Sequence, residues 1–234
     1  MREKQVIARV ERISPLTDSI LQLILMPDEY VAYQAGQYLQ ILHANQAMSY
    51  SIANAPLGSH KYELHIRHSR ENPYNQGLLE EIKSRGAVTI LVPLGDCHLQ
   101  RLDAERPILF IAAGTGFAPV KAMIEQLLAN ADDRAFELYW GVRSQSDLYM
   151  DDKVNYWKDH VSHFHYFSSV SDRSKSSLGK MLLKRHTQDV KDWQIVISGP
   201  FDMVYQTRDI LLEQGVSPQY LFSDAFSFEQ KEES

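Results

Sequence analysis

The first hundred residues carry short runs of apolar residues, each long enough for one β-strand and bounded by turn residues. Short strands that follow one another in this way favour a closed antiparallel barrel or a sandwich. A helical pattern over 77–83 interrupts the series and is followed by Gly86, a residue type that commonly ends helices. The predicted strands cover residues 6–10, 19–25, 38–42, 50–53, 62–66 and 88–92.

After Arg106 the pattern changes to strands that alternate with helices. Apolar residues recur at helical spacing from Val120 to Leu128, and another helix is expected to end at Gly215. Such alternation predicts a parallel sheet with helices on both faces. We therefore expect an all-β domain over 1–101, an α/β domain over 102–228 and a disordered charged tail over 229–234. The α/β strands are expected at residues 107–113, 136–140, 164–170, 194–198 and 220–223.

Composition places the chain among ordinary globular proteins, with 44% hydrophobic and 23% charged residues. No apolar run reaches the roughly 18 residues of a membrane helix, and no apolar signal core follows Met1, so the cytoplasm is the expected location. The formal net charge of −6 argues against nucleic acid as the main partner. The single cysteine, Cys97, excludes internal disulfides and cysteine-ligated clusters, and we expect it to be a small buried side chain.

The most informative segment of the chain joins the first α/β strand to its helix. The apolar run 108–113 leads into Gly114-Thr115-Gly116, and a helical pattern begins at Pro119, a residue type favoured at the first helical position. Exposed N–H groups and the helix dipole at such a turn attract the pyrophosphate of a nucleotide. Pro119 replaces the third glycine of the usual dinucleotide pattern, so the two glycines are equally compatible with a plain tight turn.

The ends of two further predicted strands add candidate nucleotide contacts. Arg143 follows the second α/β strand, where NAD-specific folds commonly carry an acidic residue for the ribose 2′-hydroxyl. Arg143 could instead meet a 2′-phosphate, with Ser144 adding a hydroxyl donor, or it is a surface arginine in a loop. The fourth strand leads into the turn 198–201. Because strand ends form the ligand crevice of an open α/β sheet, three such ends favour a binding site.

Six motifs occur in order along the chain, namely G-Q-Y (36–38), M-S-Y-S (48–51), A-A-G-T-G-F-A-P (112–119), L-Y-W-G-V-R (138–143), G-P-F-D-M (199–203) and L-F-S-D-A-F-S-F (221–228). Together they resemble the ferredoxin–NADP reductase superfamily and in particular its short NAD(P)H:flavin oxidoreductases, the bacterial flavin reductases. The resemblance spans about residues 4–228 and implies an N-terminal antiparallel Greek-key β-barrel that binds flavin and a C-terminal parallel-sheet α/β domain that binds NADPH or NADH. It implies hydride transfer from nicotinamide C4 to flavin N5.

The resemblance assigns roles to individual residues. Ser51 is implied to be the catalytic hydroxyl near flavin N5, and Thr115 is implied to lie near both reactants. Considered alone, Tyr50 and Ser51 fit an ordinary strand better. The implied cofactor contacts in the first domain are Tyr38, Met48, Ser49, Tyr50, Ser51, His65, Ile66 and Arg67. Those in the second domain are Gly114, Thr115, Gly116, Phe117, Arg143, Ser198, Gly199, Pro200, Phe201 and Phe226.

The chain departs from the family pattern at Met48, where the superfamily carries an arginine that pairs with the flavin phosphate. Methionine cannot neutralise a phosphate, so we expect riboflavin, FMN or FAD to bind chiefly through ring and ribityl chain and to leave after reduction. The reduced flavin would serve a downstream flavin-dependent monooxygenase or another electron acceptor. Two alternatives stay open: an FAD-holding reductase subunit of an oxygenase or other electron-transfer chain, and a non-catalytic flavin- or nucleotide-binding regulatory module.

No metal site is expected from the sequence. His160, His163 and His165 are close together, but no carboxylate or cysteine stands near them at a convincing ligand spacing. An edge strand with solvated histidines explains the same pattern. Both nicotinamide nucleotides are expected to be accepted, with NADPH moderately favoured through Arg143.

Overall fold

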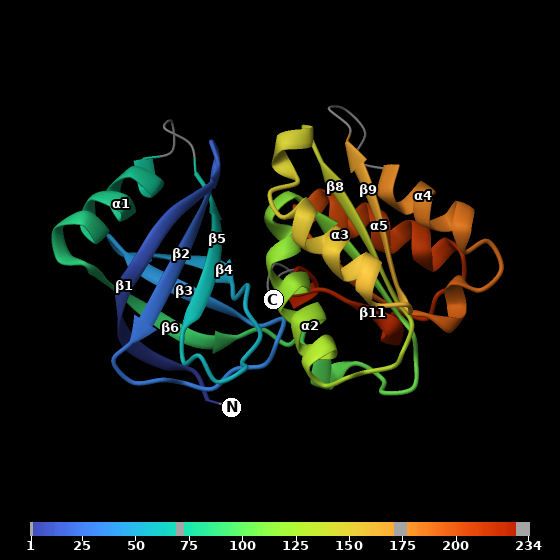
Figure 1. Ribbon diagram of the computed structural model, residues 1–234, viewed down its shortest axis with the longest axis horizontal. Helices are drawn as coiled ribbons and strands as arrows, with labels where there is room; N and C mark the ends of the chain where they lie inside the picture. Colours follow the sequence, from blue (N-terminus) through green and yellow to red (C-terminus); the bar gives the residue numbers. More distant parts are fainter. Residues whose placement is uncertain (1, 69–72, 171–176, 228–234) are drawn as a thin grey trace. The chain divides into compact units, whose positions relative to one another are not determined.

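The computed structural model describes residues 2–68, 73–170 and 177–227. The chain forms two compact units (Figure 1), and each has its own hydrophobic core. Unit 1 is Met1–Leu99 with Lys121–Asn130, and unit 2 is Gln100–Val120 with Ala131–Ser234. The predicted disordered tail at 229–234 lies outside the described residues.

Unit 1 is built on a six-stranded antiparallel sheet with the order β4-β3-β6-β1-β2-β5, which confirms the predicted all-β domain. Beyond the edge strand β4, Ile52 forms an antiparallel bridge with Leu64 of β5, so the two edges of the sheet meet at this point. The strands are β1 (Lys4–Thr17), β2 (Ile20–Pro27), β3 (Tyr38–His43), β4 (Gln46–Ser51), β5 (Tyr62–Arg67) and β6 (Ala87–Leu94).

The strand β4 begins earlier than the sequence pattern predicted, at Gln46 instead of Tyr50. Ala44 and Asn45 adopt left-handed backbone angles, with φ of 49° and 59°, and so form a tight turn between β3 and β4. Four consecutive residues of β4 are exposed because the strand lies at the edge of the sheet. An edge strand with little burial lacks the apolar alternation by which strands are recognised in a sequence.

The core of unit 1 lies on the inner face of this sheet. Side chains that alternate along β5, namely Tyr62, Leu64 and Ile66, pack there with residues of the other strands. The helix α1 (Pro73–Arg85) adds Leu78 and Ile82 to the same core. It ends at Gly86, whose φ of 65° is the left-handed conformation expected of a glycine cap.

Unit 2 contains a five-stranded parallel sheet with the order β11-β10-β7-β8-β9, which confirms the predicted α/β domain. The first strand along the chain, β7, has β8 on one side and β10 on the other, so the chain order reverses between β7 and β10. Such a reversal is a topological switch point. The strands are β7 (Ile108–Ala113), β8 (Phe136–Val142), β9 (Phe164–Val170), β10 (Gln194–Ser198) and β11 (Leu221–Phe222).

Helices cover both faces of this sheet, as predicted, and α3 and α5 lie on opposite sides of it (Figure 1). Leu109 and Ile111 of β7 pack with Leu178 of α4 and Val204 of α5. The intervening Phe110 points to the other face, where its ring contacts that of Phe136. The helices are α2 (Phe117–Ala129), α3 (Asp151–His160), α4 (Ser177–Arg185) and α5 (Phe201–Glu213).

The helix α2 begins at Phe117, two residues before the predicted start at Pro119. A 3-10 turn, Gly114–Gly116, immediately precedes it. Pro119 is accommodated inside the first turn because N–H groups there have no acceptor within the helix. No helix among the described residues has the length and apolar character needed to cross a bilayer.

Candidate functional site

Two glycine-containing turns meet at the carboxyl edge of the unit 2 sheet, one after β7 and one after β10. A Cβ atom on Gly116 would lie 2.3 Å from the carbonyl oxygen of Ser198 and 2.8 Å from the backbone nitrogen of Gly199. Gly199 has a φ of 152°, and a Cβ atom there would lie 2.9 Å from that of Ala113. Both positions therefore require glycine, because any side chain would separate the two turns.

Because Gly116 and Gly199 have no side chains, the backbone of these turns is left uncovered at the switch point of the sheet. Open α/β sheets bind their ligands at this position, outside the carboxyl ends of the strands. The N–H groups that open α2 lie in the same turn, and the helix dipole favours an anion there. Thr115, half-buried between Gly114 and Gly116, has a hydroxyl that makes no hydrogen bond to any described residue. The edge fits a nucleotide whose pyrophosphate approaches the backbone closely.

Phe117 supports this turn from inside unit 2. Its ring is buried and stacks on Trp140, with centroids 4.1 Å apart and an angle of 19° between the planes. The indole nitrogen of Trp140 donates a hydrogen bond of 3.0 Å to the carbonyl oxygen of Gly114. The structure thus gives Phe117 and Trp140 a role in holding the glycine turn. Trp140 lies in the motif at 138–143, but its hydrogen bond could not be read from the sequence.

An exposed arginine, Arg143, and a serine that is hydrogen-bonded within the protein, Ser144, follow the end of β8. Arg143 makes no ion pair with a described residue. The Ser144 hydroxyl donates to Oδ2 of Asp147 at 3.0 Å, and the Ser144 N–H donates to the same oxygen at 3.2 Å. This capping arrangement uses the hydroxyl hydrogen that was predicted to serve a 2′-phosphate. Arg143 is therefore the candidate for that contact, and a carboxylate lies closer to this strand end than the sequence suggested.

The remaining unit 2 candidates lie around α5. Phe201, the first residue of α5 after Pro200, is 49% exposed. Phe226 is half-buried and packs against the core of unit 2. Tyr205 lies between them, with ring centroids 6.2 Å from Phe201 and 6.4 Å from Phe226. Its hydroxyl donates to the carbonyl oxygen of Ala225 at 2.9 Å and so ties the C-terminal segment to α5. Phe228, the last residue of the 221–228 motif, is outside the described residues.

The candidate flavin contacts of unit 1 begin on the edge strand β4. Tyr38 and Ser51 are brought together, because they face each other in the register of β3 and β4. Met48 is 38% exposed, and the Ser49 hydroxyl accepts a hydrogen bond of 3.3 Å from Gln40. Tyr50 packs partly against the core. The strand therefore offers an accessible polar surface with no cation at residue 48.

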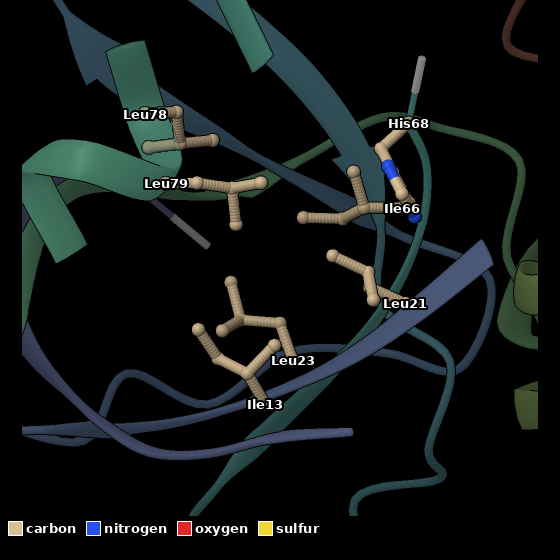
Figure 2. Close-up of a pocket in the computed structure, with 7 residues that line it drawn as sticks. All are labelled: Ile13, Leu21, Leu23, Ile66, His68, Leu78 and Leu79. Carbon is tan, nitrogen blue, oxygen red and sulfur yellow. The ribbon is translucent and has the colours of Figure 1, made fainter. Parts of the chain in front are cut away.

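The candidates on β5 point to opposite faces of the sheet. Ile66 lines an apolar pocket of unit 1 together with Leu21, Leu23 and Leu78, and its side chain points into that pocket (Figure 2). It can therefore offer only its backbone to a ligand on the outer face. His65 lies on the outer face but is buried, with Nε2 2.8 Å from Oε1 of Glu63. Burial lowers the pKa of His65, and Arg67 is exposed at the strand end.

A buried group of charges behind His65 was missed by the sequence analysis. Lys121 of α2 has a side chain only 3% exposed, and its Nζ lies 3.0 Å from Glu125 and 3.4 Å from Glu63. Burial alone would raise the pKa of Glu63, but the hydrogen bond from His65 and the charge of Lys121 lower it to about 2. The available signal was the spacing of Lys121 and Glu125, two opposite charges one helical turn apart in a mostly apolar helix.

Comparison with known proteins shows where such a chain belongs. Residues 110–209 match the family model described as an oxidoreductase NAD-binding domain. The NAD(P)H-flavin reductase of Aliivibrio fischeri is 30% identical over 232 residues, which cover 94% of this chain and 98% of that protein. The CDP-6-deoxy-L-threo-D-glycero-4-hexulose-3-dehydrase reductase of Yersinia pestis is 32% identical over 89% of this chain, and the chain spans 64% of its length.

The fold is also found in solved structures. A cytochrome P450 reductase from Amycolatopsis superposes with a TM-score of 0.84 and 24% identity, over 95% of this chain and 69% of that one. The shared fold and the match at residues 110–209 define the class as oxidoreductases with an NAD-binding domain. Identity along nearly the full length then shows that the chain belongs to the NAD(P)H-flavin reductase family, as the sequence motifs predicted.

Proposed function

We propose that this protein is an NAD(P)H-dependent flavin reductase that takes flavin as a substrate and releases it after reduction. The main structural support is the close approach of Gly116 to Ser198, which leaves a backbone-lined edge at the switch point where a dinucleotide fits. The similarity to NAD(P)H-flavin reductases over almost the whole chain supports flavin as the second substrate. NADPH or NADH then supplies a hydride from nicotinamide C4, which flavin accepts at N5.

The residues of the chain contribute orientation. In this proposal unit 1 holds the flavin along β4, and unit 2 holds the nicotinamide nucleotide at the turns after β7 and β10. The hydroxyls of Ser51 and Thr115 make no hydrogen bond to any described residue, so each is available to a bound molecule. Well-oriented reactants about 3–3.5 Å apart avoid much of the entropic cost of the reaction. Ser51 would hold the flavin near N5, and Thr115 the nicotinamide.

The absence of a cation at residue 48 favours release of the flavin. Met48 is exposed on β4, where the superfamily pattern has a phosphate-binding arginine. A charge-assisted bond to phosphate is among the stronger contacts that a protein offers, and methionine cannot make it. The ring and ribityl chain would then supply most of the affinity. The reduced flavin would pass to a flavin-dependent monooxygenase or another acceptor, in the cytoplasm where NAD(P)H is supplied.

Two measurements test this proposal. The visible absorbance of the purified protein should show no stoichiometric flavin. Addition of riboflavin together with NADPH or NADH should then produce steady oxidation of the nucleotide, many turnovers for each protein molecule. A colourless protein without turnover on riboflavin, FMN or FAD would contradict the proposal and leave a non-catalytic binding module.

A second candidate function is an FAD-holding reductase that passes electrons to a protein. It is favoured by the 29% identity to reductase component 1 of terephthalate 1,2-dioxygenase from Comamonas, of which the chain spans 64%. The chain has one cysteine, so an iron–sulfur acceptor would need to lie outside these 234 residues. Purification of a stoichiometrically yellow protein, slow with free riboflavin but fast with a ferredoxin, would favour this candidate.

A further inference from the structure

The backbone that follows Ser51 is held from two directions. On one side, the N–H of Ala53 donates to the carbonyl oxygen of Glu63 on β5 at 2.7 Å. On the other, Nζ of Lys121 donates to the carbonyl oxygen of Ala53 at 2.9 Å. One helical turn further along α2, Glu125 accepts a hydrogen bond of 3.4 Å from the N–H of Ala55. Two charged side chains of one helix therefore hold both ends of the segment 53–55.

The buried ammonium group of Lys121 has three close oxygen partners. It donates hydrogen bonds to the Ala53 carbonyl and to the Glu63 carboxylate, and it forms an ion pair with Glu125. Lysine is almost never buried unless it is paired in this way. Removing the ammonium would leave two carboxylates facing each other and the Ala53 carbonyl without its partner.

The carboxylate of Glu63 is itself fixed from the sheet. Its Oε1 accepts hydrogen bonds from His65 on β5 and from Gln22 on β2, both at 2.8 Å. Its Oε2 faces Lys121. The ammonium therefore binds to a rigid anchor. The segment 53–55 lies outside the strands, and side chains of α2 bond to its Ala53 carbonyl and its Ala55 N–H.

We propose that Lys121 and Glu125 are positioning residues for the flavin, because they fix the segment 53–55 and through it the hydroxyl of Ser51. This rests on the proposed function, in which flavin binds along β4 beside Ser51. Ser51 is the last residue of β4, and only Ile52 separates it from the held Ala53. A displacement of about 1 Å in a positioning group can slow a reaction by roughly 100-fold, so the bonds at residues 53 and 55 bear directly on catalysis.

The test compares two variants that release the segment with two that do not. Lys121→Met removes the bond to Ala53, and Glu125→Ala removes the bond to Ala55. Glu125→Gln keeps an oxygen acceptor for the Ala55 N–H, and Gln126→Ala changes the same helix beside the contact. The Gln126 side chain donates to Asn130, the residue after the end of α2, and makes no hydrogen bond to the described segment 53–55.

Steady-state kinetics give the first readout. Bonds to charged groups are among the stronger hydrogen bonds. Lys121→Met and Glu125→Ala should therefore raise the Michaelis constant for riboflavin by about tenfold and lower turnover. The Michaelis constant for NADH should stay within about twofold of wild type. Glu125→Gln should restore most of the loss, and Gln126→Ala should behave as wild type. A folded Lys121→Met protein with unchanged riboflavin kinetics, or one that loses NADH affinity equally, would overturn the proposal.

Hydrogen exchange gives a second readout that needs no activity. The amide of Ala55 should exchange faster in both releasing variants than in wild type or Gln126→Ala. Unchanged exchange at Ala55 in both would also overturn the proposal. If Lys121→Met does not fold, Glu125→Ala decides the question alone. A wild-type protein that never reduces flavin contradicts the proposed function, whereas an active wild type with unaffected variants contradicts only the role of Lys121 and Glu125.

Discussion

The carbonyl oxygen of Ser198 lies 2.3 Å from the position that a Cβ atom on Gly116 would occupy. Real Cβ atoms do not approach other heavy atoms so closely, so the turn after β7 can touch the turn after β10 only if residue 116 is glycine. The neighbouring atom belongs to the backbone and cannot rotate away. This contact shapes the edge at which we propose that the nicotinamide nucleotide binds.

Gly116→Ala should therefore impair the nucleotide half of the reaction. The added methyl group would force the two turns apart, and we expect the Michaelis constants for NADPH and NADH to rise by about tenfold or more, as for a cost of 1.4 kcal/mol or above. Steady-state kinetics and riboflavin binding would measure the two halves separately. Gly179→Ala on α4 is the matched control, because its Cβ would meet only Ile210 at 3.9 Å. It should stabilise unit 2 by about 0.5–1 kcal/mol.

Ser51→Ala should reduce turnover while the protein stays folded. Ser51 pairs with Tyr38 in the register of β3 and β4, and its hydroxyl bonds to no described residue, so little packing is lost. If the hydroxyl stabilises the flavin where the hydride arrives, its loss should slow turnover by about 10- to 100-fold. Stopped-flow measurement of flavin reduction would report this step. An unchanged rate in a folded variant would remove Ser51 from the catalytic site.

Met48→Arg should shift flavin preference towards FMN. With methionine at this exposed position, riboflavin is expected to bind within about tenfold of FMN, a difference of roughly 1.4 kcal/mol or less. An arginine there supplies the missing phosphate contact and should favour FMN over riboflavin. Binding titrations with both flavins measure the ratio. A wild-type preference of a thousandfold for FMN would point to another cation, such as Arg67; Arg70 lies outside the described residues.

Arg143→Ala should separate NADPH from NADH. The guanidinium is exposed beyond β8 and has no ion-pair partner among the described residues. Its removal should raise the Michaelis constant for NADPH by about tenfold and leave that for NADH nearly unchanged, since only NADPH carries the 2′-phosphate. Equal losses for both would mean that Arg143 recognises adenine. Because Asp147 takes the Ser144 hydroxyl, Ser144→Ala should affect NADPH less than Arg143→Ala does.

The stability of unit 2 should fall as the pH rises. His186 is buried between Glu137, 3.0 Å from Nε2, and Asp189, 3.2 Å from Nδ1. Burial opposes the charged imidazolium, but the hydrogen bond and charge of Glu137 raise the pKa of His186 above 6.5. This stabilisation by His186 is therefore complete below pH 6.5 and is lost as the pH rises through the pKa of His186 in the folded protein. Each unit by which the folded pKa exceeds the unfolded pKa corresponds to about 1.4 kcal/mol.

Thermal unfolding across this range measures the effect, with His186→Gln as the comparison. The variant should be less stable below pH 6.5 and should show a flatter dependence above it. The glutamine cannot take up a proton, so the linked loss disappears. A wild-type profile that is already flat above this pH would contradict the role given to His186.

The sequence determined the local elements and the order in which they occur. Alternation in β5, helical spacing in α2 and the glycine that ends α1 all follow from interactions between neighbours along the chain, and the structure bears them out. The buried position of Cys97 was also correctly predicted. The pattern of apolar residues predicts the start of β4 four residues too late, because the exposed residues 46–49 leave no apolar pattern. The sequence pattern therefore fails where a strand is not buried.

Only the tertiary structure decided which distant groups meet. The contact of Gly116 with Ser198 exists because strand order places β7 beside β10, and no local pattern specifies that neighbour. The burial of Lys121 depends likewise on a segment from another part of the chain. The sequence suggests a free hydroxyl at Ser144, but the turn after β8 brings Asp147 within hydrogen-bond distance of it. Hydrophobic periodicity reports which face of an element is covered, whereas polar partners are set by how the elements pack.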